Sequence, residues 1–202
     1  MLINYFKIAW RNLAKNKAYS VINIGGLAVG ITVAILISLW IYDELTFNKG
    51  HKHYHRIVQV LQHQHIKDGL ETFSALPLPL TKELRNNHGN DLPKVAASMI
   101  FEQFIAYENK MVTRTGIFAE PDITDIIIPE MIAGEARSLT DPNAVLISES
   151  LAKSLFGTGD AMNKSVKLNN TFTYKVSGVF KKMPGNSRFA YMDFIAPLTL
   201  MV

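Results

Sequence analysis

One stretch of the sequence, Ala18 to Tyr42, contains no charged side chain and is rich in apolar residues. At a rise of about 1.5 Å per residue, a helix of this length extends roughly 37 Å, which exceeds the ~30 Å hydrocarbon core of a bilayer. Aromatic rings, which favour the head-group region, lie at both ends, with Tyr19 at one and Trp40 and Tyr42 at the other. The stretch predicts a transmembrane helix over residues 18–42.

The charges on either side of this stretch predict its orientation. Four bases and no acid precede it, and two acids follow it: Lys7, Arg11, Lys15 and Lys17 before, Asp43 and Glu44 after. The positive-inside rule therefore keeps the N-terminus in the cytoplasm and places residues 43–202 outside. A cleaved signal peptide is the competing interpretation, but it would have an apolar region of about 7 to 15 residues and a small-residue cleavage site, and neither is present.

Composition narrows the function classes. The chain has 21 Lys and Arg against 17 Asp and Glu, a formal net charge of +4, and no cysteine. All of the excess charge precedes the apolar stretch, so the part from Asp43 onward is neutral and offers no basic groove for nucleic acid. The lack of cysteine excludes disulfides, thiolate nucleophiles and Cys-ligated metals.

Residues 1–17 predict an amphipathic helix that lies on the cytoplasmic face of the membrane. Apolar residues recur at steps of three and four while the bases recur at steps of four on another face. The apolar stripe consists of Leu2, Phe6, Ala9, Trp10 and Leu13. We expect Phe6 and Trp10 to contact lipid and Arg11 and Lys15 to face anionic head groups.

Within the apolar stretch, Gly26 and Gly30 have the G-x-x-x-G spacing that lets a second helix approach closely. This spacing predicts a helix-packing role for both glycines.

The exported residues 43–202 predict an α+β domain with a mixed, mostly antiparallel sheet and short helices. Apolar runs bounded by turn signals indicate the strands, and capping residues indicate the helices. The expected strands cover 56–66, 70–74, 95–107, 111–119, 143–147, 166–168, 172–180 and 192–196, and the expected helices cover 80–87, 121–127 and 149–156.

Two motifs raise the question of chemistry. Histidines at steps of two, from His51 to His55 and again at His63 and His65, share a strand face and leave open a metal site that would need a third ligand. Ser150 and Lys153 match S-x-x-K, a serine acyl-transfer signature, but its companion motifs are missing. Phosphate-binding glycine loops are also missing, so the sequence predicts no catalytic residue, no cofactor site and no enzyme.

The order of longer motifs resembles the start of MacB/FtsX-like ABC transporter permeases, notably those of Bacteroidetes. The matching segments are Trp10–Lys17, Ser20–Gly30, Tyr42–Leu45, Phe118–Asp122, Leu139–Gly157, Val176–Phe180 and Pro184–Ser187. The resemblance covers nearly the whole chain and implies that residues 43–202 form a MacB-like periplasmic core domain.

The resemblance also implies a role and partners. It implies a permease subunit in the bacterial inner membrane, working as a dimer with a separate cytoplasmic ABC ATPase that binds the ATP, and with a periplasmic partner. Family members continue into three more membrane helices, whereas this sequence ends at Val202. We therefore expect a fragment of a longer permease, truncated at its C-terminus.

A rival hypothesis from another class is a signal-anchored sensor whose outer domain binds a ligand or a metal near His51 to His65. Such a domain would hold an enclosed pocket or a cluster of ligands. A permease domain would instead present open surfaces to its partners.

Overall fold

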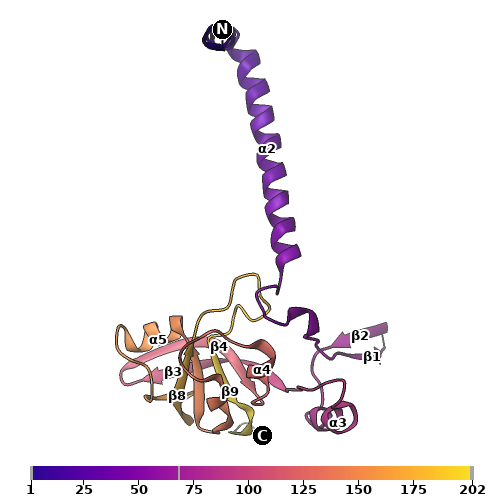
Figure 1. Ribbon diagram of the computed structural model, residues 1–202, viewed down its shortest axis with the longest axis vertical. Helices are drawn as coiled ribbons and strands as arrows, with labels where there is room; N and C mark the ends of the chain where they lie inside the picture. The colour runs from indigo at the N-terminus through magenta and orange to yellow at the C-terminus, as the bar shows by residue number, and fades with distance from the viewer. Residues whose placement is uncertain (1, 68, 201–202) are drawn as a thin grey trace. The chain divides into compact units, whose positions relative to one another are not determined.

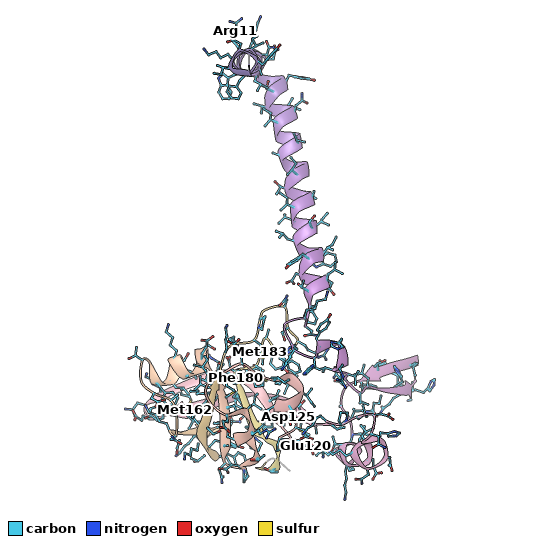
Figure 2. All side chains as sticks on the ribbon, in the orientation of Figure 1. Arg11, Glu120, Asp125, Met162, Phe180 and Met183 are labelled. Carbon is cyan, nitrogen blue, oxygen red and sulfur yellow. The ribbon has the colours of Figure 1, made fainter. Side chains whose placement is uncertain are left out.

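The computed structural model describes residues 2–67 and 69–200, and the chain divides into two compact units, one ending at Phe47 and one beginning at Asn48. The first unit contains α1 (Leu2–Lys15) and α2 (Lys17–Thr46), with Asn16 between them (Figure 1). Side chains project from α2 on all sides (Figure 2) and are exposed, except for the buried Ser20 and the half-buried Thr46.

The second unit begins with small elements that lie apart from the main sheet. They are the 3-10 turn η1 (Tyr54–Arg56), the strands β1 (Gln62–Ile66) and β2 (Gly69–Phe73), and the helix α3 (Pro79–His88). β1 and β2 form an antiparallel hairpin that pairs with no other described strand (Figure 1). Asp68, which lies between β1 and β2 in the sequence, is outside the described residues.

The predicted strand over 56–66 is wrong in its first half. Arg56 belongs to η1, and the chain becomes a strand only at Gln62. Val58 is 73% exposed, so the apolar run that suggested a buried strand here has no sheet to pack into. A run of β-branched residues fits a strand only where a neighbouring strand supplies the hydrogen bonds.

The larger sheet has the order β5-β8-β6-β9-β4-β3-β7, and β7 also pairs with β8. Its strands are β3 (Ser98–Tyr107), β4 (Lys110–Ala119), β5 (Met131–Gly134), β6 (Ala144–Ser148), β7 (Ser165–Leu168), β8 (Phe172–Phe180) and β9 (Phe194–Pro197). The β4–β9 and β6–β8 pairings are parallel and the others antiparallel. This mixed, mostly antiparallel sheet confirms the predicted α+β class.

The core fills both faces of this sheet. On one face, α5 (Glu149–Phe156) contributes Leu151 and Leu155 to a cluster with Phe118, Tyr174 and other residues of the strands. On the other face, α4 (Ile123–Ile127) and the 3-10 segment η2 (Ala136–Thr140) cover a second cluster. Every residue of the central strand β6 is buried, because the strand is covered on both faces.

The ends of α5 and the turn between β7 and β8 are set by residues with strong local preferences. The Ser148 hydroxyl accepts a hydrogen bond from the Leu151 N–H and begins α5, and Gly157, at φ 67°, ends it. Asn169 and Asn170 both have positive φ, as their hairpin turn between β7 and β8 requires. β5 and η2, by contrast, were not predicted.

Candidate functional site

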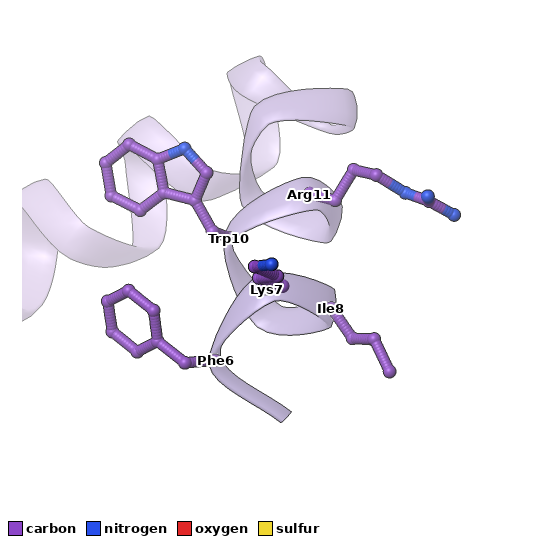
Figure 3. A pocket seen from close by; sticks show the side chains of 5 residues that line it. All are labelled: Phe6, Lys7, Ile8, Trp10 and Arg11. Atoms are coloured by element: carbon purple, nitrogen blue, oxygen red, sulfur yellow. The ribbon is translucent and has the colours of Figure 1, made fainter. Parts of the chain in front are cut away.

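The surface of α1 that sequence analysis singled out is exposed. Phe6 and Trp10 lie side by side on one side of the helix, and Arg11 points to the opposite side (Figure 3). Lys7 and Ile8, also on this helix, are exposed as well. Trp10 is 67% and Phe6 is 72% exposed, so both rings present apolar surface that no described part of the chain covers. The side chain of Leu2, part of the predicted stripe, is not among those described.

A hydrogen bond fixes the bend between α1 and α2. The Ser20 hydroxyl donates to the carbonyl oxygen of Leu13 at 3.0 Å, and the Ser20 N–H donates to the Asn16 carbonyl at 2.9 Å. The last carbonyls of a helix have no partner within it, so this side chain satisfies one of them at the end of α1. Lys15, the remaining base of the predicted interfacial set, is exposed in the last turn of α1.

α2 is long and apolar enough, by length and composition, to cross a membrane. The hydroxyl groups of Thr32 and Ser38 donate to the carbonyl oxygens of Ala28 and Ala34, both at 2.8 Å. These bonds within one helix satisfy polar groups that lipid could not. Gly26 and Gly30 lie in the middle of this helix, and a Cβ added at either would meet nothing within 4 Å. Packing among the described residues therefore does not account for these glycines.

The structure separates the histidines that the sequence brought into question. His51 is buried, and its Nε2 lies 2.7 Å from the Ser187 hydroxyl. His63 lies on the exposed hairpin and contacts Thr72 Oγ1 at 2.9 Å. Over residues 2–67 and 69–200, no three His, Asp or Glu side chains come together in a group that could hold a metal ion.

Ser150 of the S-x-x-K match contacts a carboxylate, not the motif's lysine. Its hydroxyl donates to Asp193 Oδ1 at 2.9 Å, and Ser148 donates to the same oxygen at 2.6 Å. Lys182 Nζ lies 2.7 Å from this oxygen, and Arg114 Nε lies 3.7 Å from Oδ2. This Asp193 network joins the start of α5 to the residue before β9.

Two opposing effects act on the pKa of Asp193. Burial alone would raise it, because Asp193 is only 8% exposed. The hydrogen bonds from Lys182, Ser148 and Ser150 favour the charged form and outweigh burial, so the pKa lies below its usual range. The carboxylate is thus a stably charged anchor, and sequence reasoning missed it because its partners come from distant parts of the chain.

These features define the class of the protein: an α+β domain joined to a helix long and apolar enough to cross a bilayer. The family is shown by a match to the MacB-like periplasmic core domain over residues 20–201, which covers both α2 and the domain. The chain belongs to this family, a family of ABC transporter permease domains. It is thus the periplasmic domain of a membrane permease with one N-terminal candidate transmembrane helix. No curated protein matches the sequence of this chain.

The chain is similar to several solved structures. A domain of a protein described as a permease from Porphyromonas gingivalis is 25% identical, with a TM-score of 0.56, over 70% of this chain and 62% of that one. The extracellular domain of the noncanonic ABC-type transporter YknZ from Gram-positive bacteria is 18% identical, with a TM-score of 0.49 over 60% and 62% of the two chains. The periplasmic region of MacB from Actinobacillus actinomycetemcomitans is 14% identical, with a TM-score of 0.48 over 61% and 55%. The chain thus spans less than two thirds of each of these structures.

Proposed function

We propose that this chain is part of the permease subunit of an ABC transporter in the bacterial inner membrane, coupling ATP hydrolysis by a separate cytoplasmic ATPase to export or mechanical work in the periplasm. The observation that carries the proposal is the family match, which includes α2 and the domain in one continuous segment. The chain itself is not an enzyme and binds no cofactor in this proposal. The partner ATPase binds the ATP.

The proposal divides the chain into three parts. Residues 1–17 are a cytoplasmic interfacial helix, residues 18–42 are the transmembrane helix, and residues 43–202 are the periplasmic core domain. The charge pattern supports this orientation, since four bases precede the apolar helix and no acid does.

The interfacial residues have two roles in this arrangement. Phe6 and Trp10 bury their rings at the inner leaflet, and Arg11 and Lys15 reach anionic head groups or the ATPase. The exposed apolar rings of α1 support this role. Gly26 and Gly30 pack against a membrane helix of a second permease copy, and the open space around both glycines supports this.

In-cell photocrosslinking tests the ATPase partner. A photoreactive amino acid replacing Arg11 on α1 should yield a crosslink to an ABC ATPase that mass spectrometry identifies. The same residue replacing Thr113, which is exposed on β4, is the matched control and should yield none. Crosslinks from position 11 to lipid alone, or ATPase crosslinks from position 113, would count against the proposal.

A further inference from the structure

The first four residues of the second unit, Asn48 to His51, are bonded to a loop far away in the sequence. This loop, Lys181 to Asp193, connects β8 to β9. The Asn48 N–H donates to the Asn186 carbonyl at 2.9 Å, and the Asn48 side-chain oxygen accepts from the Arg188 N–H at 2.7 Å. Asn48 has φ 60°, a left-handed conformation that asparagine tolerates better than most residues.

His51 completes this attachment from a buried position. It is 7% exposed, and its ring meets Phe189 edge-on, with centroids 5.4 Å apart. Its Nδ1 lies 3.4 Å from the Ile127 carbonyl oxygen. Its Nε2 lies 2.7 Å from the Ser187 hydroxyl, in hydrogen-bond distance. We call Asn48, His51 and their partners in this loop the Asn48–His51 clamp.

The loop is in turn attached to the sheet at both ends. At its start, the Lys181 N–H donates to the Glu130 carbonyl at 2.8 Å. At its end, the Asp193 backbone bonds to Thr115 and Ser148, and Lys182 pairs with the Asp193 carboxylate. A displacement of the loop therefore acts on β8 and β9, both of which lie beside the central strand β6.

The covalent route from His51 to the same sheet is long. The chain passes through η1 and the exposed β1–β2 hairpin before it reaches α3, where Arg85 pairs with Glu120 at the end of β4, and it enters the large sheet at Ser98. The hairpin pairs only with itself among the described strands. A segment with few packed contacts yields locally when it is pulled and transmits little. The clamp bypasses this segment.

We infer that the Asn48–His51 clamp is the joint through which movement of α2 reaches the large sheet, with Asn48 and His51 as its positioning residues. The inference rests on the proposed function only where it assigns the clamp a role in transport. The hydrogen bonds of the clamp form without an ATPase or a nucleotide. Asn48 and His51 bind to this chain's own loop between β8 and β9, and no ligand is needed.

Hydrogen exchange of the full chain in nanodiscs tests whether the clamp forms. Asn48→Gly keeps the left-handed backbone accessible but removes the oxygen that accepts from Arg188. The Arg188 amide should then exchange about tenfold faster. The matched control is His53→Ala, since this exposed side chain takes part in none of the clamp's contacts and should leave that amide unchanged.

Distances between spin labels test transmission, and the lack of native cysteine makes each labelled pair unique. Labels at Leu45→Cys and Lys153→Cys measure the distance from α2 to α5, which packs on the large sheet. Labels at Leu45→Cys and Gln64→Cys measure the distance from α2 to the β1–β2 hairpin. The first pair should give the narrower distance distribution. Asn48→Gly, His51→Ala and Ser187→Ala should broaden it to the breadth of the second pair, whereas His53→Ala should not.

Two results would overturn the inference. One is that, in the unmodified chain, the distance distribution between labels at positions 45 and 153 is as broad as that between positions 45 and 64. The other is that the clamp variants retain their melting temperature and the distance distribution between positions 45 and 153 stays narrow. Because His51→Ala removes a buried side chain, Asn48→Gly and Ser187→Ala decide the outcome if it does not fold. Neither ATPase nor nucleotide is present, so a failure of the proposed ATPase partnership leaves this result unaffected.

Discussion

At the scale of single residues, Asp193 is a buried charge held by several partners. Its carboxylate is buried, and it receives hydrogen bonds from Lys182, Ser148 and Ser150. Removing one partner of a buried ionic network leaves the remaining charges unpaired, which costs more than the network itself contributes. Arg114 and Lys182 would then face each other without an intervening negative charge.

Asp193→Asn should lower the free energy of unfolding by about 2–3 kcal/mol at neutral pH. The folded-state pKa lies below the ordinary value of 3.8, so the charged carboxylate stabilises the fold above that value. This stabilisation is lost as the pH falls through the folded pKa, and the variant should lack that part of the acid sensitivity. Urea unfolding of the full chain in micelles, between about pH 3 and pH 7, measures both effects.

Glu102→Gln is the matched control for this prediction. Glu102 is also a sheet residue, on β3, but it is exposed, and its substitution should leave both stability and pH dependence unchanged. Equal acid sensitivity in Asp193→Asn and the unmodified chain would show that folding leaves the pKa of this carboxyl unchanged, against the lowered value expected from its hydrogen bonds.

Gly116 on β4 is required for close packing, not for backbone freedom. A Cβ at this position would overlap the ring and the carbonyl oxygen of Phe194 on the neighbouring strand β9. Gly116→Ala should therefore destabilise the domain by about 3 kcal/mol or more, because the contact is with backbone that cannot move aside. Thermal unfolding of the full chain followed by circular dichroism measures this.

The comparison for Gly116 is Gly185→Ala in the loop before β9. A Cβ there meets nothing within 4 Å, so this variant should unfold at the temperature of the unmodified chain or slightly above it. Similar losses in both variants would mean that β4 and β9 do not approach as closely as described.

At the scale of elements, α1 can be followed by its own fluorescence. The chain has two tryptophans, so Trp40→Phe leaves Trp10 as the only one. In nanodiscs of anionic lipid, Trp10 emission should shift to the blue, and head-group-labelled lipids should quench it more strongly than lipids labelled deep in the acyl chain. Replacing Lys7, Arg11 and Lys15 with Gln should weaken this immersion by about 1 kcal/mol per base.

Zwitterionic nanodiscs provide the control for α1. There the three substitutions should have little effect, because no surface charge attracts the bases. Trp10 emission at the wavelength of a fully hydrated indole in anionic nanodiscs would exclude the interfacial position.

The elements also show which parts of the fold the sequence could predict. α5 was predicted at its observed bounds, because its cap Ser148 and its stop Gly157 are local signals that act within a few residues. β5 was missed because its four residues become a strand only by pairing with β8, which follows much later in the chain. Residues 57–61 show the opposite error, since a local strand pattern found no partner.

The same limit applies to the site. The apolar stripe of α1 could be predicted from the sequence because residues three and four apart share a helix face. The Asn48–His51 clamp could not be predicted from the sequence. Asn48 and Ser187 lie far apart along the chain, and the residues next to each of them give no signal of the contact. The histidine repeat drew attention to His51 for metal binding, whereas its ring bonds to Ser187 and the Ile127 carbonyl.

At the scale of the whole molecule, the proposed function requires that α1 and the domain lie on opposite sides of a membrane. The lack of cysteine makes this directly testable, because one introduced thiol is the only one present. Asn12→Cys places it on α1, and Lys153→Cys places it on an exposed position of α5. Neither side chain takes part in the Asp193 network or the Asn48–His51 clamp, so we expect both variants to fold.

A membrane-impermeant maleimide added to intact spheroplasts should label position 153 and leave position 12 unlabelled until the cells are lysed. The physical reason is the four bases before the uncharged stretch 18–42, which resist transfer across the membrane, while the neutral domain after that stretch carries no such bias. The unmodified chain, without a thiol, controls for nonspecific labelling. Labelling of position 12 from outside would reverse the orientation, and with it the side on which an ATPase could meet α1. Protection of both positions until lysis would mean that the domain remains in the cytoplasm.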